Sequence, residues 1–228
     1  LQEIWESKLE PVYPYRKAGA NVDKINGRLE APAAAPKIGV AKPKVIIPVF
    51  PGTNCEYDTA HAFARAGADP EILVIRNLTP ADVTASCEAL VKAIGESQIV
   101  MLPGGFSGGD EPDGSAKFIA SFFRNPAVTE AVRELLQKRD GLMLGICNGF
   151  QALIKLGLVP YGDIRPITSY DPTLTFNTIG RHQSMLVRTR IASTGSPWLS
   201  NCAVGDEHTV AISHGEGRFV APHNVLDE

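Results

Sequence analysis

The chain has 228 residues and a formal net charge of −3, and 44% of its residues are hydrophobic and 21% are charged. This balance is typical of a soluble globular protein with one large or two small domains. No Lys/Arg-rich face is visible, so the charge pattern argues against nucleic acid or an anionic membrane as a partner and favours small molecules. No apolar run approaches the roughly 20 residues that span a bilayer, and the N-terminus lacks the layout of a signal peptide, so we expect a cytoplasmic protein.

Residues 1–43 form the first predicted segment, and they differ from the rest of the chain. They contain prolines, alanines and charges without a sustained apolar period. Such a segment cannot bury enough apolar surface to offset its ordering entropy, so we predict a linker or tether from a preceding domain. Trp5, with Ile4 and Leu9, indicates a short docking helix at its start.

From Lys44 onward, predicted strands and helices alternate. The strands are short and apolar, as expected when helices cover both faces of a sheet; they are residues 44–50, 71–77, 98–105 and 141–147. The helices are residues 56–66, 80–94 and 126–138, and the second of them has Thr79 as N-cap and Pro80 at its first position. This alternation predicts an α/β fold with an open, mostly parallel sheet and right-handed crossovers. Toward the C-terminus, residues 185–192 and 208–214 are predicted as antiparallel strands.

Three loops that leave predicted strand ends carry unusual residues. They are FPGTNCEYD after the first strand, LPGGFSGGDEPDG after the third and GICNGFQ after the fourth. In open parallel sheets, ligands gather at the carboxyl ends of the strands, where such loops meet. We therefore expect the functional site at this edge of the sheet.

Cys147 lies in G-x-C-x-G, where a strand is predicted to run straight into a helix. The glycines permit a sharp turn, which is the layout of a nucleophile elbow with sulfur in place of oxygen. The N-terminus of the following helix favours the thiolate form. The backbone N–H of Asn148 would point toward an oxyanion that forms at an attacked carbonyl.

The PGGFSGGD loop is predicted to supply the other half of an oxyanion site. It has four glycines in eight residues, which suits close approach of backbone to ligand. A phosphate-binding loop is the alternative, but neither G-x-G-x-x-G nor a P-loop ending is present. An amide-binding role fits better.

Together, GICNGFQ, PGGFSGGDEPDGSAKF, FPGTNCEYD and SHGEGRF resemble the glutaminase domain of phosphoribosylformylglycinamidine synthase, a class I glutamine amidotransferase domain. The resemblance runs from about Lys44 to the end, and the first ten residues resemble the tether to the synthetase part in single-chain versions. It implies a flavodoxin-like sheet with helices on both faces. We therefore expect a tether over residues 1–43 and a glutaminase domain over residues 44–228, as a C-terminal fragment of a large single-chain form.

The resemblance also implies roles for individual residues. Cys147 matches the nucleophile that attacks the side-chain amide of glutamine, forms a γ-glutamyl thioester and releases ammonia. The backbone N–H groups of Gly105 and Asn148 would bind the oxyanion. Three further residues would line the glutamine pocket: Phe106, Ser107 and Gln151.

The implied partner is a synthetase domain or subunit that uses the ammonia. It converts formylglycinamide ribonucleotide to formylglycinamidine ribonucleotide in de novo purine synthesis. ATP and Mg belong to that separate synthetase, so no cofactor and no metal is expected in this domain.

The general base of the thiol is the open question of the sequence. His214 and Glu216 form an H-x-E pair, and on a strand both side chains would share one face. The resemblance argues against them, because the family's pair lies in a later H-x-E-R segment. We expect the family's His–Glu pair to lie beyond residue 228, because we expect the domain to be truncated before its end. His214 and Glu216 are kept as the second choice. The remaining histidines are expected to be surface or satisfied core residues: His61 in a helix, His182 in a strand connection, His208 at a strand start and His223 in the final loop.

The other cysteines give no C-x-x-C pair and no histidine at metal-ligand spacing, so neither zinc nor a disulfide framework is predicted. Cys87 and Cys202 are expected to be small buried hydrophobes. Cys55 lies at a strand-to-helix junction, where a helix dipole also acts, but packing under the active-site loop is favoured, with Asn54 or Glu56 as the contact to ligand or partner.

Two alternatives to the glutaminase remain. The first is another thiol hydrolase on the same scaffold, such as a cysteine peptidase-like or chaperone-like relative. The second is a non-catalytic interaction domain, which the missing base keeps open. Gln151 and the PGGFSGGD loop favour glutamine over a peptide substrate. A fragment without the base is expected to hydrolyse glutamine poorly.

Overall fold

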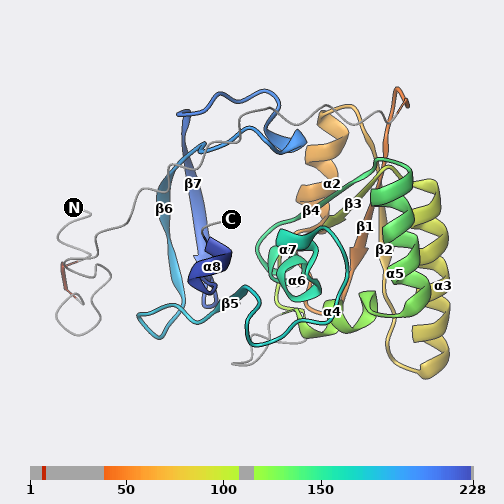
Figure 1. Cartoon of the computed structure of the whole chain (residues 1–228). Coiled ribbons are helices and arrows are strands. Elements are labelled where there is room, and N and C mark those ends of the chain that lie inside the picture. Colours follow the sequence, from red (N-terminus) through yellow and green to blue (C-terminus); the bar gives the residue numbers. More distant parts are fainter. Residues whose placement is uncertain (1–6, 9–38, 108–115, 227–228) are drawn as a thin grey trace. The chain divides into compact units, whose positions relative to one another are not determined.

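The computed structural model describes residues 7–8, 39–107 and 116–226, and it divides the chain into two compact units (Figure 1). Of the described residues, the larger unit comprises 39–107, 116–176 and 216–226. Of the described residues, the smaller unit comprises 7–8 and 177–215. The tether predicted over residues 1–43 and its docking helix lie outside the described residues, apart from positions 7–8 and 39–43.

The larger unit is built on a parallel four-stranded sheet with the order β2-β1-β3-β4. The strands are β1 (Lys44–Val49), β2 (Asp69–Val74), β3 (Ile99–Leu102) and β4 (Leu142–Gly145). All four predicted strands are therefore confirmed. Each of the four residues of β3 is buried, as expected for a central strand covered on both faces.

Side-chain alternation along the strands divides the core between the two faces of the sheet. On one face, Val45, Ile47, Ile99 and Met101 form a cluster. Ala60 and Phe63 of α2 (Glu56–Arg65) pack against it. On the other face, Ile46, Val100 and Leu102 belong to a larger cluster. The predicted cover of helices on both faces is confirmed.

The helices that contribute to the larger cluster include α3 (Pro80–Glu96), α4 (Lys117–Phe123), α5 (Pro126–Arg133) and α6 (Asn148–Leu156). The predicted start of α3 is confirmed, because the Thr79 side chain accepts a hydrogen bond from the Asp82 N–H and Pro80 follows the cap. The helix predicted over 126–138 continues past α5 as the π-helical turn η1 (Glu134–Lys138). The sequence did not predict α4.

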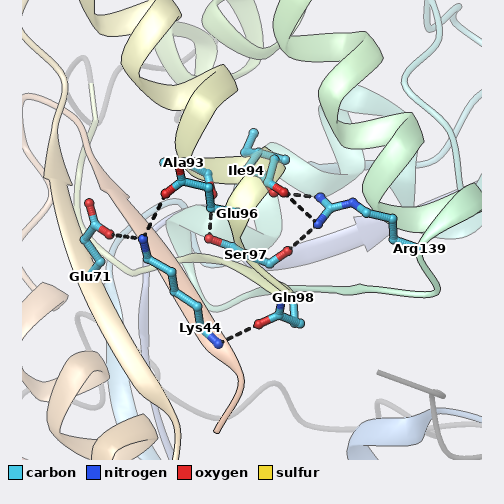
Figure 2. A network of polar contacts seen from close by, with 9 residues as sticks. Lys44, Glu71, Ala93, Ile94, Glu96, Ser97, Gln98 and Arg139 are labelled. Carbon is cyan, nitrogen blue, oxygen red and sulfur yellow. Dashed lines mark hydrogen bonds and ion pairs between the residues drawn. The ribbon is translucent and has the colours of Figure 1, made fainter. Parts of the chain in front are cut away.

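A polar network joins the amino-terminal edge of the sheet to the end of α3 (Figure 2). The Arg139 guanidinium donates to the carbonyls of Ile94, Gly95 and Ser97. It thereby satisfies carbonyl groups that a helix end leaves without intrahelical partners. Gln98, the residue after Ser97, contacts the start of β1, because its side chain accepts a hydrogen bond from the Lys44 N–H at 2.8 Å. This edge lies opposite the strand ends that carry the site.

The chain after α6 forms α7 (Leu158–Tyr161) and then an antiparallel pair of three-residue strands, β5 (Thr173–Thr175) and β8 (Arg218–Val220). Neither strand was predicted. The short helix α8 (His223–Leu226) ends the described chain, so the prediction that His223 lies in a loop is wrong.

The smaller unit contains the antiparallel strands β6 (Gln183–Arg190) and β7 (Glu207–His214), joined by a connection with the 3-10 turn η2 (Pro197–Leu199). Both antiparallel strands expected in this region are confirmed, with bounds shifted by one or two residues. The Asn177 N–H donates to the Gly215 carbonyl at 2.9 Å, which ties together the two ends of the segment 177–215.

Candidate active site

Cys147 lies between β4 and α6 in a strained backbone conformation. Its φ is 53° and its ψ is −109°, a region that non-glycine residues rarely occupy. The residue is exposed, and it precedes the first residue of α6. Strain of this kind persists only where the surroundings impose it, and it occurs preferentially at functional positions. The elbow predicted from G-x-C-x-G is therefore present in the structure.

Close backbone packing explains the two glycines of the elbow. A Cβ atom on Gly149 would lie 2.0 Å from the Leu102 carbonyl oxygen, and one on Gly145 would lie 2.5 Å from the Gly149 carbonyl oxygen. The Ile146 N–H donates to the same Leu102 carbonyl at 3.1 Å. The elbow thus rests directly on the end of β3, and a side chain at either glycine would displace it.

The segment Gly104–Ser107 after β3 lies against the nucleophile. A Cβ atom on Gly104 would lie 3.5 Å from Cys147 Cβ and 3.8 Å from the Ile146 carbonyl oxygen. Gly105 has a φ of 150°, and its Cα faces the loop after β1 so closely that a Cβ would lie 2.5 Å from the Gly52 carbonyl oxygen. The third and fourth strand ends therefore meet at Cys147, as the sequence predicted.

Two backbone hydrogen bonds join this segment to the loop after β1. The Phe106 N–H donates to the Gly52 carbonyl at 2.8 Å, and the Asn54 N–H donates to the Gly104 carbonyl at 3.3 Å. Thr53 and Gly105 between them form an isolated antiparallel bridge. Because these bonds flank the bridge, the N–H of Gly105 points away from the Gly52–Asn54 loop. This orientation suits the role expected for Gly105.

A chain of buried polar side chains runs beneath the elbow. Both the N–H and the hydroxyl of Ser107 donate to Asn148 Oδ1, at 3.2 Å and 2.7 Å. Asn148 Nδ2 donates to Gln151 Oε1 at 2.9 Å, and Gln151 Nε2 donates to the Glu216 carbonyl at 3.0 Å. All four residues are buried. The sequence grouped Ser107 and Gln151 as glutamine contacts, whereas the structure shows both bonded to protein groups.

Phe106 differs from these buried residues, because its side chain is 42% exposed. Ile146, beside the nucleophile, is also exposed. These two apolar side chains flank the strand ends from which Gly104 and Cys147 come.

Cys55 is a second thiol close to the nucleophile. The Cβ position at Gly104 that lies 3.5 Å from Cys147 Cβ is 3.4 Å from Cys55 Sγ. Burial raises the pKa of the Cys55 thiol, and the nearby charges of Cys147, Asp58 and Glu56 raise that pKa further. Cys55 is therefore disfavoured as a thiolate, but the residue is exposed, so the prediction that it packs under the active-site loop is not confirmed. The sequence missed its proximity to Cys147.

His214 is oriented by an amide. Its Nδ1 lies 2.9 Å from Asn177 Oδ1, and Asn177 Nδ2 donates to the carbonyls of His214 and Arg181. Since the amide oxygen can only accept, the ring Nδ1 carries the proton in this arrangement. The other histidines lie at the expected places in the described chain, apart from His223.

The prediction that His214 and Glu216 share a strand face is wrong, because β7 ends at His214 and Glu216 follows in a bend. Glu216 also belongs to the larger unit, whereas His214 belongs to the smaller one. There Glu216 is buried and interacts electrostatically with Lys155 of α6. Burial lowers the pKa of Lys155, and the charge of Glu216 acts in the opposite direction.

Two features are absent from the described parts of the chain. No cluster of three or more His, Cys, Asp or Glu side chains suited to a metal is found there. Nor does any helix of this part have the length and apolarity needed to cross a bilayer. A hollow of about 490 Å³ also occurs in the larger unit, but it contains none of the predicted site residues; its lining is Arg124, Thr129, Ile164, Arg165, Pro166 and Ile167.

Residues 42–228 match the family model of the CobB/CobQ-like glutamine amidotransferase domain. The chain is 35% identical over 183 residues to the PurQ subunit of phosphoribosylformylglycinamidine synthase from Rubrobacter xylanophilus, covering 80% of this chain and 69% of that protein. It is 34% identical over 189 residues to the corresponding subunit from Methanococcus maripaludis, covering 82% of this chain and 62% of that protein. The chain thus spans about two thirds of the length of these curated relatives.

A chain in the structure of PurLQS from Thermotoga maritima shares the fold, with a TM-score of 0.59 and 24% sequence identity. The alignment covers 80% of this chain and 71% of that one. The motif resemblance is confirmed, whereas membership in a large single-chain form stays a prediction. From the match over residues 42–228 and the identity with two PurQ subunits, the chain belongs to the CobB/CobQ-like glutamine amidotransferase family, in the group of the PurQ subunits of phosphoribosylformylglycinamidine synthase.

Proposed function

We propose that this chain releases ammonia from glutamine through a thioester on Cys147. The observation that carries the proposal is the strained elbow, which presents an exposed thiol beside the Gly104–Gly105 segment. A thiol at a helix N-terminus is a suitable nucleophile for an amide carbonyl. Two backbone N–H groups beside it supply the electrostatic stabilisation that acyl transfer requires.

In the first half-reaction, the Cys147 sulfur attacks the side-chain carbonyl carbon of glutamine. The N–H groups of Gly105 and Asn148 stabilise the oxyanion of the tetrahedral intermediate. The C–N bond then breaks, the nitrogen takes up a proton, and ammonia leaves. Water next attacks the γ-glutamyl thioester, which gives glutamate and restores the thiol. Phe106 lines the glutamine site at its exposed rim.

A general base must move the protons in both half-reactions. The His and Glu expected beyond residue 228 are our first choice, and His214 is the second. The structure supports an oriented ring at His214, but Glu216 does not orient it. This chain contributes the nucleophile, the oxyanion donors and the glutamine site to the reaction.

We further propose that a synthetase domain or subunit of phosphoribosylformylglycinamidine synthase consumes the ammonia. The family membership supports this assignment. The synthetase would use ATP and Mg to convert formylglycinamide ribonucleotide to formylglycinamidine ribonucleotide. No cofactor is needed for the thioester chemistry of this chain, because the nucleophile and oxyanion donors are protein groups.

An electrophilic glutamine analogue, such as a diazoketone, should label Cys147 once in the complete enzyme. Peptide mass mapping would locate the adduct, and Cys147→Ser should abolish it because the thiol is the attacking group. Cys55→Ser is the matched control, and it should label as the wild type does. An adduct that persists in Cys147→Ser would overturn the assignment of the nucleophile.

The same Cys147→Ser variant separates the glutaminase from the synthetase. Formation of formylglycinamidine ribonucleotide should stop with glutamine as nitrogen source and continue with added ammonium. If the variant loses both reactions while it stays folded, the division of labour between Cys147 and the synthetase is wrong.

A further inference from the structure

The side chain of Asn148 connects the two parts of the proposed oxyanion site. Its backbone N–H follows the nucleophile on α6, and its Oδ1 accepts both donors of Ser107 from the loop after β3. Ser107 has no exposed surface and Asn148 is 1% exposed, so water does not compete for these bonds. Since Ser107 ends the Gly104–Ser107 segment, the position of Gly105 depends on this contact.

The segment is held on its other side by the loop after β1, through the bond from the Phe106 N–H to the Gly52 carbonyl. The N–H groups of Phe106 and Ser107 are thus both committed to protein acceptors. The N–H of Gly105, in contrast, points away from the loop after β1. Two anchors on opposite sides fix the direction of that N–H.

Only an amide satisfies the chain of bonds below the elbow. The Glu216 carbonyl can only accept, so Gln151 must present Nε2 to it and Oε1 to Asn148. Asn148 must therefore present Nδ2 to Gln151, which leaves Oδ1 for the two donors of Ser107. A carboxylate at position 148 could accept from Ser107 but could not donate to Gln151.

We propose that the Asn148 side chain is a positioning group for the oxyanion donors: it aligns the Gly105 N–H with its own backbone N–H across the elbow. This inference rests on the proposed glutaminase function. The amide is also neutral, so it fixes the segment without placing a negative charge near the developing oxyanion.

The test measures glutamine hydrolysis and iodoacetamide alkylation of Cys147 in the complete enzyme. Asn148→Ala should lower kcat by about 10²-fold to 10³-fold, as the loss of one oxyanion donor does, while KM changes by less than about threefold. Alkylation forms no oxyanion, so its rate should stay within about twofold of the wild type. A purely structural loss of the elbow would change both rates together.

Ser107→Ala is the second variant, because it removes the hydroxyl, one of the two Ser107 groups that donate to Asn148 Oδ1, from the loop after β3. It should lower kcat by roughly tenfold and leave the alkylation rate unchanged. If the two residues act through each other, the kcat of the double variant should lie within about twofold of the kcat of Asn148→Ala. Asn148→Asp should also be slow, since it cannot donate to Gln151. Normal kcat in Asn148→Ala and Ser107→Ala, or a parallel fall in alkylation, would overturn the proposal. A wild type whose hydrolysis does not depend on Cys147 would instead refute the proposed function.

Discussion

At the scale of single residues, the structure shows a structural contact for His214, which the sequence had offered as the second choice for the general base. Its bond to Asn177 Oδ1 joins the end of β7 to the first residue of the segment 177–215. Asn177 is itself buried and donates to two carbonyls of that unit. The geometry accounts for His214 as part of a local structural network.

The variant His214→Gln should therefore lose stability and keep activity. We expect about 1 kcal/mol less free energy of unfolding, because one hydrogen bond to a buried amide is removed. Glutamine hydrolysis should stay within about threefold of the wild type in the complete enzyme. Thermal denaturation and initial rates would measure the two effects. A fall of kcat by about 100-fold without loss of stability would identify His214 as the general base.

At the scale of elements, the connection between α7 and β5 is organised around one carboxylate. Asp171 Oδ1 accepts from the Tyr161 hydroxyl at 2.7 Å, and its Oδ2 accepts from the Thr168 N–H and hydroxyl at 2.6 Å and 2.9 Å. The Arg165 guanidinium contacts the same carboxylate and stacks on the Tyr161 ring. These donors, with the Tyr161 hydroxyl first, hold the pKa of Asp171 far below its usual range.

This connection gives a stability that depends on pH. A depressed pKa in the folded state stabilises the fold above the unfolded pKa of about 3.9, and the contribution is lost as the pH falls through the folded value. Asp171→Asn should therefore destabilise the chain at pH 7, and the difference from wild type should narrow below about pH 4. Urea denaturation at pH 7, 4 and 3 would measure it. A difference that stays constant over this range would show that charge is not the cause.

The elements that the sequence predicted are those with a clear local signal. The start of α3 was predictable because Thr79 and Pro80 give the cap and the first turn. In contrast, α4 follows Ala116, whose φ is 68° and whose side chain cannot cap, so no start signal precedes its seven residues. The strands β5 and β8 have three residues each, which is too few for a periodicity to be recognised.

At the scale of the whole molecule, the chain leaves the larger unit after Phe176 and returns at Glu216. Residues 177–215 of the smaller unit are thus an insertion between β5 and β8, which pair with each other in the larger unit. The bond between the Asn177 N–H and the Gly215 carbonyl closes the insertion at its base. This connectivity explains why the H-x-E pair of the sequence is divided: its histidine ends the insertion and its glutamate re-enters the larger unit.

The candidate site was predictable where one short segment contained the chemistry. Cys147, its glycines and the adjacent loop after β3 were assigned from their motifs and are adjacent in the structure. The pairing of Asn148 with Gln151 follows from helical spacing, but the link from Ser107 to Asn148 joins residues 41 positions apart. Such a contact depends on how two loops pack, and no local pattern encodes it. The proximity of Cys55 to Cys147 likewise depends on how two loops pack.

The backbone conformation of Cys147 lowers the stability of the folded protein. Its conformation is the mirror image of an extended one, which a residue with a Cβ adopts at a cost of about 1–3 kcal/mol and which glycine adopts freely. Cys147→Gly should therefore unfold at a higher temperature than Cys147→Ala, although both lack the thiol. Calorimetry of the two inactive variants would measure the difference, and equal melting temperatures would show that the elbow relaxes without strain. If Cys147→Gly melts at the higher temperature, it is the more stable variant in which to trap unreacted glutamine. Cys147→Ala would keep a backbone conformation closer to that of the native site.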